Sequence, residues 1–208
     1  MAKRPKFVLP GTWGRVNLDS EAASRRSIRR LAESATGRRE ELASVRNELR
    51  DRLQTAADAA REGGASDFYI AFELARGIPL PAWLAVFEPD IDSTDFAGLG
   101  LQELTKLLEV GASVVGTGED AEVVTSQPST KMHAVRHSWR RTAHVAEGDV
   151  EQDFELIEAD YWLAATDPNR IALLTFSTAY AEYEEEMLGL FDAVVATIRW
   201  PATPVTAD

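Results

Sequence analysis

Residues 153–200, DFELIEADYWLAATDPNRIALLTFSTAYAEYEEEMLGLFDAVVATIRW, decide the fold of this chain. The stretch opens with two runs rich in β-forming residues, 154–164 and 170–177. Between them lies Thr166-Asp167-Pro168-Asn169, in which proline suits the second position of a tight turn and Asp and Asn suit its neighbours. This pattern predicts a β-hairpin.

The second half of the same stretch predicts a helix. Its apolar residues recur three or four positions apart, the spacing that places side chains on one face of a helix. We expect this apolar stripe to lie on the sheet that the hairpin helps to form. The stripe consists of Tyr180, Tyr183, Met187, Leu190, Phe191, Val194, Val195 and Ile198.

The N-terminal part predicts a strand followed by a long helical region. Residues 7–18 resemble an opening strand or strand pair, and Ser20 or Asp19 can cap a helix that continues to about residue 62. Gly37 interrupts the helical pattern, so we expect either one kinked helix or a helix pair. A coiled coil is an alternative. The apolar or small residues of this region are Ile28, Leu31, Ala35, Leu42, Val45, Leu49, Leu53, Ala56 and Ala60.

The middle of the chain predicts a second, looser hairpin and a further helix. Strand-like runs at 68–75 and 82–87 flank a segment whose prolines exclude a central strand. A short helix follows from Leu101 to about Gly111, then a turn at 116–120, and then strands at 122–125 and 131–145. Hairpins outnumber helical crossovers, which favours the α+β class with an antiparallel β-sheet flanked by helices. We expect a single domain over 7–201 with disordered ends at 1–6 and 202–208.

Composition excludes several functional classes. The 208 residues include no cysteine, so disulfides, thiolate zinc sites and cysteine nucleophiles are absent. No apolar run suggests a signal peptide or a membrane span, and we expect a cytoplasmic protein without membrane insertion. Residues 147–192 hold thirteen acidic residues and one arginine, a net −12 that equals the charge of the whole chain. Such a field disfavours nucleic acid and favours a basic protein partner.

The sequence KMHAVRHSWRRTAHV, residues 131–145, gathers all three histidines of the chain. In a helix, His133 and His137 would be close enough to share a metal ion, but in a strand they would lie about 13 Å apart. The flanking residues favour a strand and therefore no shared metal. We expect the neighbouring Arg136, Arg140 and Arg141 to pair with the acidic residues of adjacent strands. A small anion or an acidic protein bound by these arginines is the alternative.

Two other clusters have structural explanations. Gly116-Thr117-Gly118 lacks the lysine and the strand-to-helix context of a phosphate loop. The acidic residues Glu182, Glu184, Glu185 and Glu186 fall in the first turns of the final helix, where carboxylates complement the helix dipole. Serine nucleophile motifs, HExxH and the dinucleotide-binding glycine pattern are not found. We therefore expect no catalytic, cofactor-binding or metal-binding residues.

The C-terminal pattern resembles the end of PsbP-like α/β/α sandwich proteins. The resemblance lies in the Tyr161-Trp162 strand, the strand end at 174–178, Leu190-Phe191-Asp192 and the closing Thr197-Ile198-Arg199-Trp200. The opening Leu9-Pro10-Gly11-Thr12-Trp13 and the sequence at 27–31 resemble small uncharacterised proteins of high-GC bacteria, some of them associated with type VII secretion. The resemblance implies a sheet between helices and a scaffold or adaptor role. It provides no functional residues.

These observations lead to two functional hypotheses. The first is a non-enzymatic protein-interaction or adaptor module, with a basic or secretion-related partner. The second is a small-ligand-binding sandwich with a pocket lined by some of Trp83, Trp139, Tyr161 and Trp162. The sequence leaves open whether the chain forms a homo-oligomer.

Overall fold

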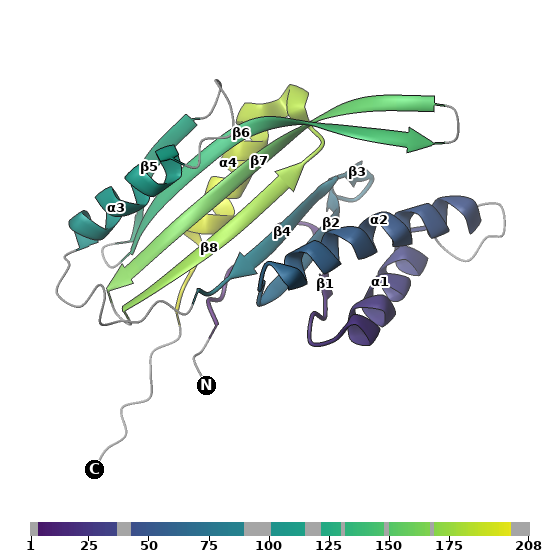
Figure 1. Cartoon of the computed structure of the whole chain (residues 1–208), viewed down its shortest axis with the longest axis horizontal. Coiled ribbons are helices and arrows are strands. Elements are labelled where there is room, and N and C mark those ends of the chain that lie inside the picture. The colour runs from purple at the N-terminus through teal and green to yellow at the C-terminus, as the bar shows by residue number, and fades with distance from the viewer. Residues whose placement is uncertain are drawn as a thin grey trace, which may run out of the picture. The chain divides into compact units, whose positions relative to one another are not determined.

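The computed structural model describes residues 4–36, 43–89, 101–114, 122–129, 132–147, 150–166 and 169–200. These residues form eight β-strands and four α-helices, and the strands pair antiparallel within each part of the chain (Figure 1). The α+β class with an antiparallel sheet is therefore confirmed. The chain divides into two compact units, which we call the N-terminal unit (Gly11–Glu88) and the C-terminal unit (Met1–Pro10 with Pro89–Asp208). The expected single domain over 7–201 stays a prediction.

The N-terminal unit contains a small antiparallel sheet in the order β1-β2-β4, with β3 paired to β2. The predicted second hairpin is confirmed, since β2 and β4 pair. The two-residue strand β3 was not predicted. Its proline is tolerated because the strand pairs only with β2 among the described strands. The strand bounds are β1 Thr12–Val16, β2 Asp67–Ala75, β3 Ile78–Pro79 and β4 Ala82–Phe87.

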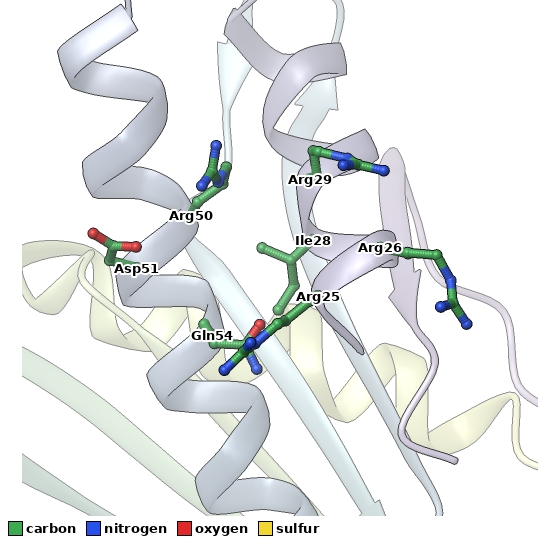
Figure 2. A pocket seen from close by; sticks show the side chains of 7 residues that line it. All are labelled: Arg25, Arg26, Ile28, Arg29, Arg50, Asp51 and Gln54. Atoms are coloured by element: carbon green, nitrogen blue, oxygen red, sulfur yellow. The ribbon is translucent and has the colours of Figure 1, made fainter. Parts of the chain in front are cut away.

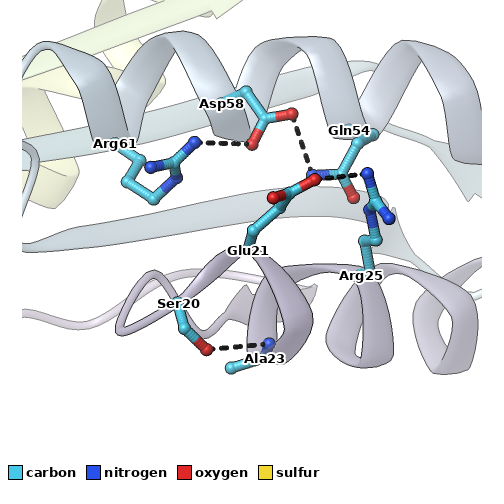
Figure 3. Close-up of polar contacts among 7 residues, drawn as sticks. All are labelled: Ser20, Glu21, Ala23, Arg25, Gln54, Asp58 and Arg61. Atoms are coloured by element: carbon cyan, nitrogen blue, oxygen red, sulfur yellow. Dashed lines mark hydrogen bonds and ion pairs between the residues drawn. The ribbon is translucent and has the colours of Figure 1, made fainter.

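Two helices, α1 (Glu21–Thr36) and α2 (Ala43–Glu62), complete this unit. The described residues thus contain a helix pair, while the predicted break at Gly37 lies outside them. As predicted, Ser20 caps α1, because its Oγ accepts a hydrogen bond of 3.2 Å from the Ala23 amide (Figure 3). Apolar residues of both helices join those of the strands in one core, which consists of Val16, Ile28, Ala57, Ala60, Phe68, Ile70 and Ala85.

The C-terminal unit is built on four antiparallel strands in the order β8-β7-β6-β5. Its strands extend further than the sequence predicts, β7 most of all. The helix α3 (Leu101–Val114) contacts β5, β6 and β7, and a short 3-10 helix (Ala181–Tyr183) precedes α4 (Glu184–Ala196). The strand bounds are β5 Glu122–Ser129, β6 Met132–Glu147, β7 Val150–Thr166 and β8 Asn169–Thr178.

The apolar stripe of the final helix is confirmed with two corrections. Phe191 stacks on Phe176 of β8 with ring centroids 4.5 Å apart, which fixes α4 on the sheet. Tyr183 is 51% exposed, contrary to expectation, because it lies in the 3-10 helix, whose turn angle differs from that of α4. Leu188 is buried and was missed. The buried residues of α4 and its end are Met187, Leu188, Phe191, Val194, Val195 and Ile198.

The two ends of the C-terminal unit meet in a short bridge. Lys6 and Arg199 exchange backbone hydrogen bonds of 2.9 Å in both directions. The Val8 amide also donates to Thr197 Oγ1 at 2.9 Å. Residues 1–3 and 202–208, which belong to the expected disordered ends, lie outside the described residues.

Strands β6 and β7 continue beyond the strands beside them. The pairing of β5 with β6 ends at Ser138, and the pairing of β8 with β7 ends at Ile157. Beyond these points, residues 139–147 of β6 and 150–156 of β7 form a two-stranded ribbon that no other described strand joins. We call this ribbon the β-arm. Figure 1 shows β6 and β7 running on together past the ends of β5 and β8.

Candidate functional site

All three histidines lie on β6, as the sequence predicts. His133 and His137 are four residues apart on an extended strand, a separation of about 13 Å that prevents them from sharing a metal ion. The His133 Nδ1 lies 2.9 Å from Thr105 Oγ1 on α3, which gives this histidine a structural contact. The described residues contain no group of three potential metal ligands. The side chain of His144 lies outside the described residues.

The arginines of β6 pair with acidic residues, as predicted, but they do so on both faces of the sheet. Arg136 and Arg140 are four positions apart on β6, so their side chains lie on the same face of the sheet, the face toward α4. Arg141 is the next residue and faces the other way. Arg136 donates to Asp192 at 2.7 Å and to Glu122 at 3.0 Å.

Asp192 of α4 also connects the helix to the core of the sheet. Its Oδ1 accepts a hydrogen bond of 2.7 Å from the hydroxyl of Tyr161, which is directly opposite Arg136 on β7. Burial, together with the nearby Asp192 carboxylate, raises the pKa of Tyr161 far above its ordinary value. Tyr161 therefore stays a neutral hydrogen-bond donor, and the cluster of Arg136, Tyr161 and Asp192 holds α4 on the sheet.

The buried Glu158 and the half-buried Asp160 lie on the opposite face of β7. Arg141 donates two hydrogen bonds to one oxygen of Glu158, at 3.0 and 2.6 Å. Thr175 donates to Asp160 at 2.6 Å. Burial raises the pKa of both carboxylates, although their hydrogen bonds act in the opposite direction.

His137 is directly across the ladder from Asp160, so that a histidine, a carboxylate and a threonine follow one another across β6, β7 and β8. His137 is 3% exposed, and its Nε2 has no hydrogen-bond partner among the described residues. Its ring packs against that of Trp139, with centroids 4.8 Å apart. The sequence did not indicate this row of His137, Asp160 and Thr175. The three residues become neighbours only through the register of β6, β7 and β8, which the sequence pattern does not specify.

The strongest candidate for a binding surface is an acidic hollow at the base of the β-arm. Its volume is about 570 Å³, and five of its seven lining residues are glutamates. Arg140 is the only cation among the lining residues, and it donates to Glu184 at 2.9 and 2.6 Å and to Glu155 at 3.2 Å. The hollow is lined by Arg140, Glu155, Ala181, Glu182, Glu184, Glu185 and Glu186.

Three carboxylates of this acidic hollow remain unneutralised. Glu182, Glu185 and Glu186 are exposed and make no ion pair with any residue that the structure describes. The sequence placed these residues at the start of the final helix and explained them by the helix dipole. That explanation holds for Glu185 and Glu186, which lie in the first turn of α4. The hollow nevertheless keeps a negative charge, because Arg140 is a single cation beside five glutamates.

The four aromatic residues considered for a ligand pocket do not share one face. Tyr161 and Trp162 are consecutive on β7, so their side chains point to opposite faces of the sheet. Tyr161 packs edge-on against Phe176 with centroids 5.5 Å apart, whereas Trp83 packs on Phe68 within the N-terminal unit at 5.7 Å. Tyr161 and Trp83 thus have packing partners in the cores of their own units, and their presence needs no ligand to explain it.

No protein-family model matches this chain, and no curated protein is significantly similar to it. The resemblance to PsbP-like proteins therefore stays a prediction. Among the helices that the structure describes, none is long and apolar enough to cross a membrane.

Proposed function

We propose that the protein is a non-enzymatic interaction module that binds a basic, extended segment of a partner protein along the β7 edge of its β-arm. The β-arm is the observation that supports this proposal. A two-stranded ribbon is marginally stable by itself, and its outer edges carry backbone groups that an added strand can pair with. Adding a strand to such an edge is a common way to bind an extended peptide.

Charge determines the kind of segment. The β7 side of the arm, residues 150–156, reads VEQDFEL and contains three acidic residues and no basic one. The acidic hollow lies at its base and adds the exposed Glu182, Glu185 and Glu186. Because like charges directly opposite each other destabilise a strand pair, a basic segment fits this edge better than a second copy of β7 does. Lysine or arginine side chains on alternate positions would reach the acidic hollow.

Other parts of the proposal rest on the sequence. The non-enzymatic role follows from the lack of recognisable catalytic motifs, and an adaptor role follows from the resemblance to PsbP-like proteins. The layer order of an α/β/α sandwich, a link to type VII secretion and a cytoplasmic location also stay predictions.

A peptide titration tests the proposal. We expect a fluorescent peptide of alternating lysine and threonine to bind the intact protein in a salt-sensitive manner, measured by anisotropy. The double variant Glu185→Lys/Glu186→Lys should bind the peptide about tenfold more weakly. It removes two carboxylates that attract the peptide's lysines and replaces them with two cations that repel them.

The matched control is Asp51→Lys/Glu62→Lys, which changes the net charge equally at exposed positions of α2. This control should bind the peptide within about twofold of the original protein, since neither residue belongs to the β-arm or lines the acidic hollow, and exposed charges outside a site contribute only weak, screened electrostatics. An equal loss in both variants would show that only the overall charge matters, and would contradict the proposal.

A further inference from the structure

A groove between α1 and α2 concentrates positive charge in a chain whose net charge is −12. Its volume is about 460 Å³, and its lining includes four arginines and one aspartate (Figure 2). This local reversal of charge lies in the N-terminal unit, on residues that the proposed binding of a basic segment does not use. The groove is lined by Arg25, Arg26, Ile28 and Arg29 from α1 and by Arg50, Asp51 and Gln54 from α2.

The core of the unit fixes the position of these arginines. Ile28 is 2% exposed and packs with Ala57 of α2, so the rotation of α1 about its axis is set. Arg25 and Arg29, one helical turn apart, therefore lie beside the line of contact between the helices. In Figure 2, Arg25 leans across toward Gln54 of α2, whereas the side chains of Arg26 and Arg29 extend from α1 on the side away from α2.

Two of the four arginines have no hydrogen-bond or ion-pair partner among the described residues, which leaves their guanidinium groups available to a ligand. Arg25 pairs with Glu21, and Arg50 donates to the Asn47 amide oxygen at 3.3 Å. Arg26 and Arg29 are exposed and make no ion pair or hydrogen bond with another described residue.

Asp51 and Asp58, two acids of α2 whose side chains the structure describes, do not cancel the positive charge of the groove. Asp58 accepts a hydrogen bond from Gln54 at 3.0 Å and pairs with Arg61 at 3.3 Å (Figure 3). Asp51 is the one carboxylate among the residues that line the groove. The lining thus keeps a net charge of +3, from four arginines and one aspartate.

We infer that this groove binds a small molecule that carries phosphate groups. Guanidinium groups form paired, charge-assisted hydrogen bonds to phosphate oxygens, and several arginines together suit a multiply charged anion. The volume falls within the range of about 300–1,000 Å³ typical of small-ligand sites. The side-chain stems of the arginines provide apolar surface beside the charges.

Isothermal titration of the intact protein with inorganic tripolyphosphate tests the inference. We expect saturable one-to-one binding. The variant Arg26→Gln/Arg29→Gln should bind about 100-fold more weakly, at about tenfold for each charge-assisted contact removed. Glutamine is a good helix former at these exposed positions, so circular dichroism should show an unchanged fold.

Arg30→Gln provides the matched control, because Arg30 is an exposed arginine of the same helix that does not line the groove. It should bind tripolyphosphate within about twofold of the original protein, as expected for a screened charge outside the site. An equal loss of affinity in this control, or no saturable binding by the intact protein, would overturn the inference. Citrate or an acidic peptide binding as tightly as tripolyphosphate would overturn the assignment to phosphate.

Discussion

Arg136 of β6 and Tyr161 of β7 show how buried polar groups find partners inside this fold. Arg136 is mostly buried, with 13% of its side chain exposed, and its partners come from β5 and from α4. Tyr161, 1% exposed, donates its hydroxyl hydrogen to the same Asp192. One carboxylate therefore satisfies both a buried cation and a buried hydroxyl, and its loss would leave both without that acceptor.

We predict that Asp192→Ala lowers the free energy of unfolding by about 1–3 kcal/mol, the cost of leaving buried donors unsatisfied. Urea unfolding measures the change. In the Tyr161→Phe background the same substitution should cost less, because the buried hydroxyl is already gone.

Glu186→Ala removes an exposed carboxylate from the same helix and should change the free energy of unfolding by about 0.5 kcal/mol or less. If Asp192→Ala were as mild as this control, the cluster of Arg136, Tyr161 and Asp192 would contribute nothing measurable to stability.

The raised pKa of Asp160 predicts how the stability of the protein depends on pH. Its pKa is raised by burial in the folded protein, so the folded state binds more protons than the unfolded state between the two pKa values. Stability should fall as the pH rises from the unfolded value of about 4 through the folded value. The variant Asp160→Asn keeps an acceptor for the Thr175 hydroxyl and has no titratable group at this position, so it should lose this dependence of stability on pH.

Urea unfolding at a series of pH values tests this expectation. The stability of Asp160→Asn relative to the original protein should increase as the pH rises above about 4. Asp51→Asn removes one negative charge at an exposed position and serves as the control. A difference for Asp160→Asn that is constant with pH, or that shrinks as the pH rises, would contradict the burial argument.

At the scale of elements, the sequence predicted what local spacing encodes. The hairpin of β7 and β8, the apolar stripe of α4 and the cap at Ser20 all depend on neighbours within a few positions, while the turn residues 167–168 lie outside the described residues. Arginine pairing was also predictable, because β6 is basic and β7 is acidic. The β-arm was not predictable, since the point where β5 and β8 stop pairing depends on the register between distant strands.

The arginine groove was missed for a different reason. The apolar residues of the first helical region were predicted to form one face, but no role was assigned to its arginines. The signal was the spacing of Arg25, Arg26, Arg29 and Arg30, which places two pairs of arginines on adjacent faces of one helix. Which of these faces borders α2 depends on how α1 packs against α2, which a single sequence does not specify.

The pairing of β1 with β2 requires glycine at position 11. Gly11 has a φ of 82°, and a Cβ there would lie 2.1 Å from the carbonyl oxygen of Glu73. We predict that Gly11→Ala lowers the free energy of unfolding by more than about 2 kcal/mol, from left-handed backbone strain and a backbone clash. Urea unfolding measures the loss.

Gly77 separates the two causes. Its φ is 79°, but a Cβ there would have no atom within 4 Å. Gly77→Ala should therefore show the backbone strain alone, about 1 kcal/mol. Equal losses at Gly11 and Gly77 would mean that the close approach of β1 to β2 adds no cost.

At the scale of the whole molecule, charge is distributed unevenly between the two units. The N-terminal unit carries the arginine groove, and the C-terminal unit carries the acidic hollow and the β-arm. We expect each surface to attract ligands of the opposite sign, so the two proposed binding surfaces differ in chemistry. Both should weaken as salt concentration rises, because most of the charges involved are exposed.

Amide hydrogen exchange of the intact protein, with and without the lysine-threonine peptide, tests the central claim most directly. Pairing of an added strand should slow exchange at alternating amides of residues 150–156, and moderate salt should reverse the effect. Peptide binding without new protection in this segment, or with protection confined to other strands, would contradict the proposal that the β7 edge of the β-arm captures a basic segment.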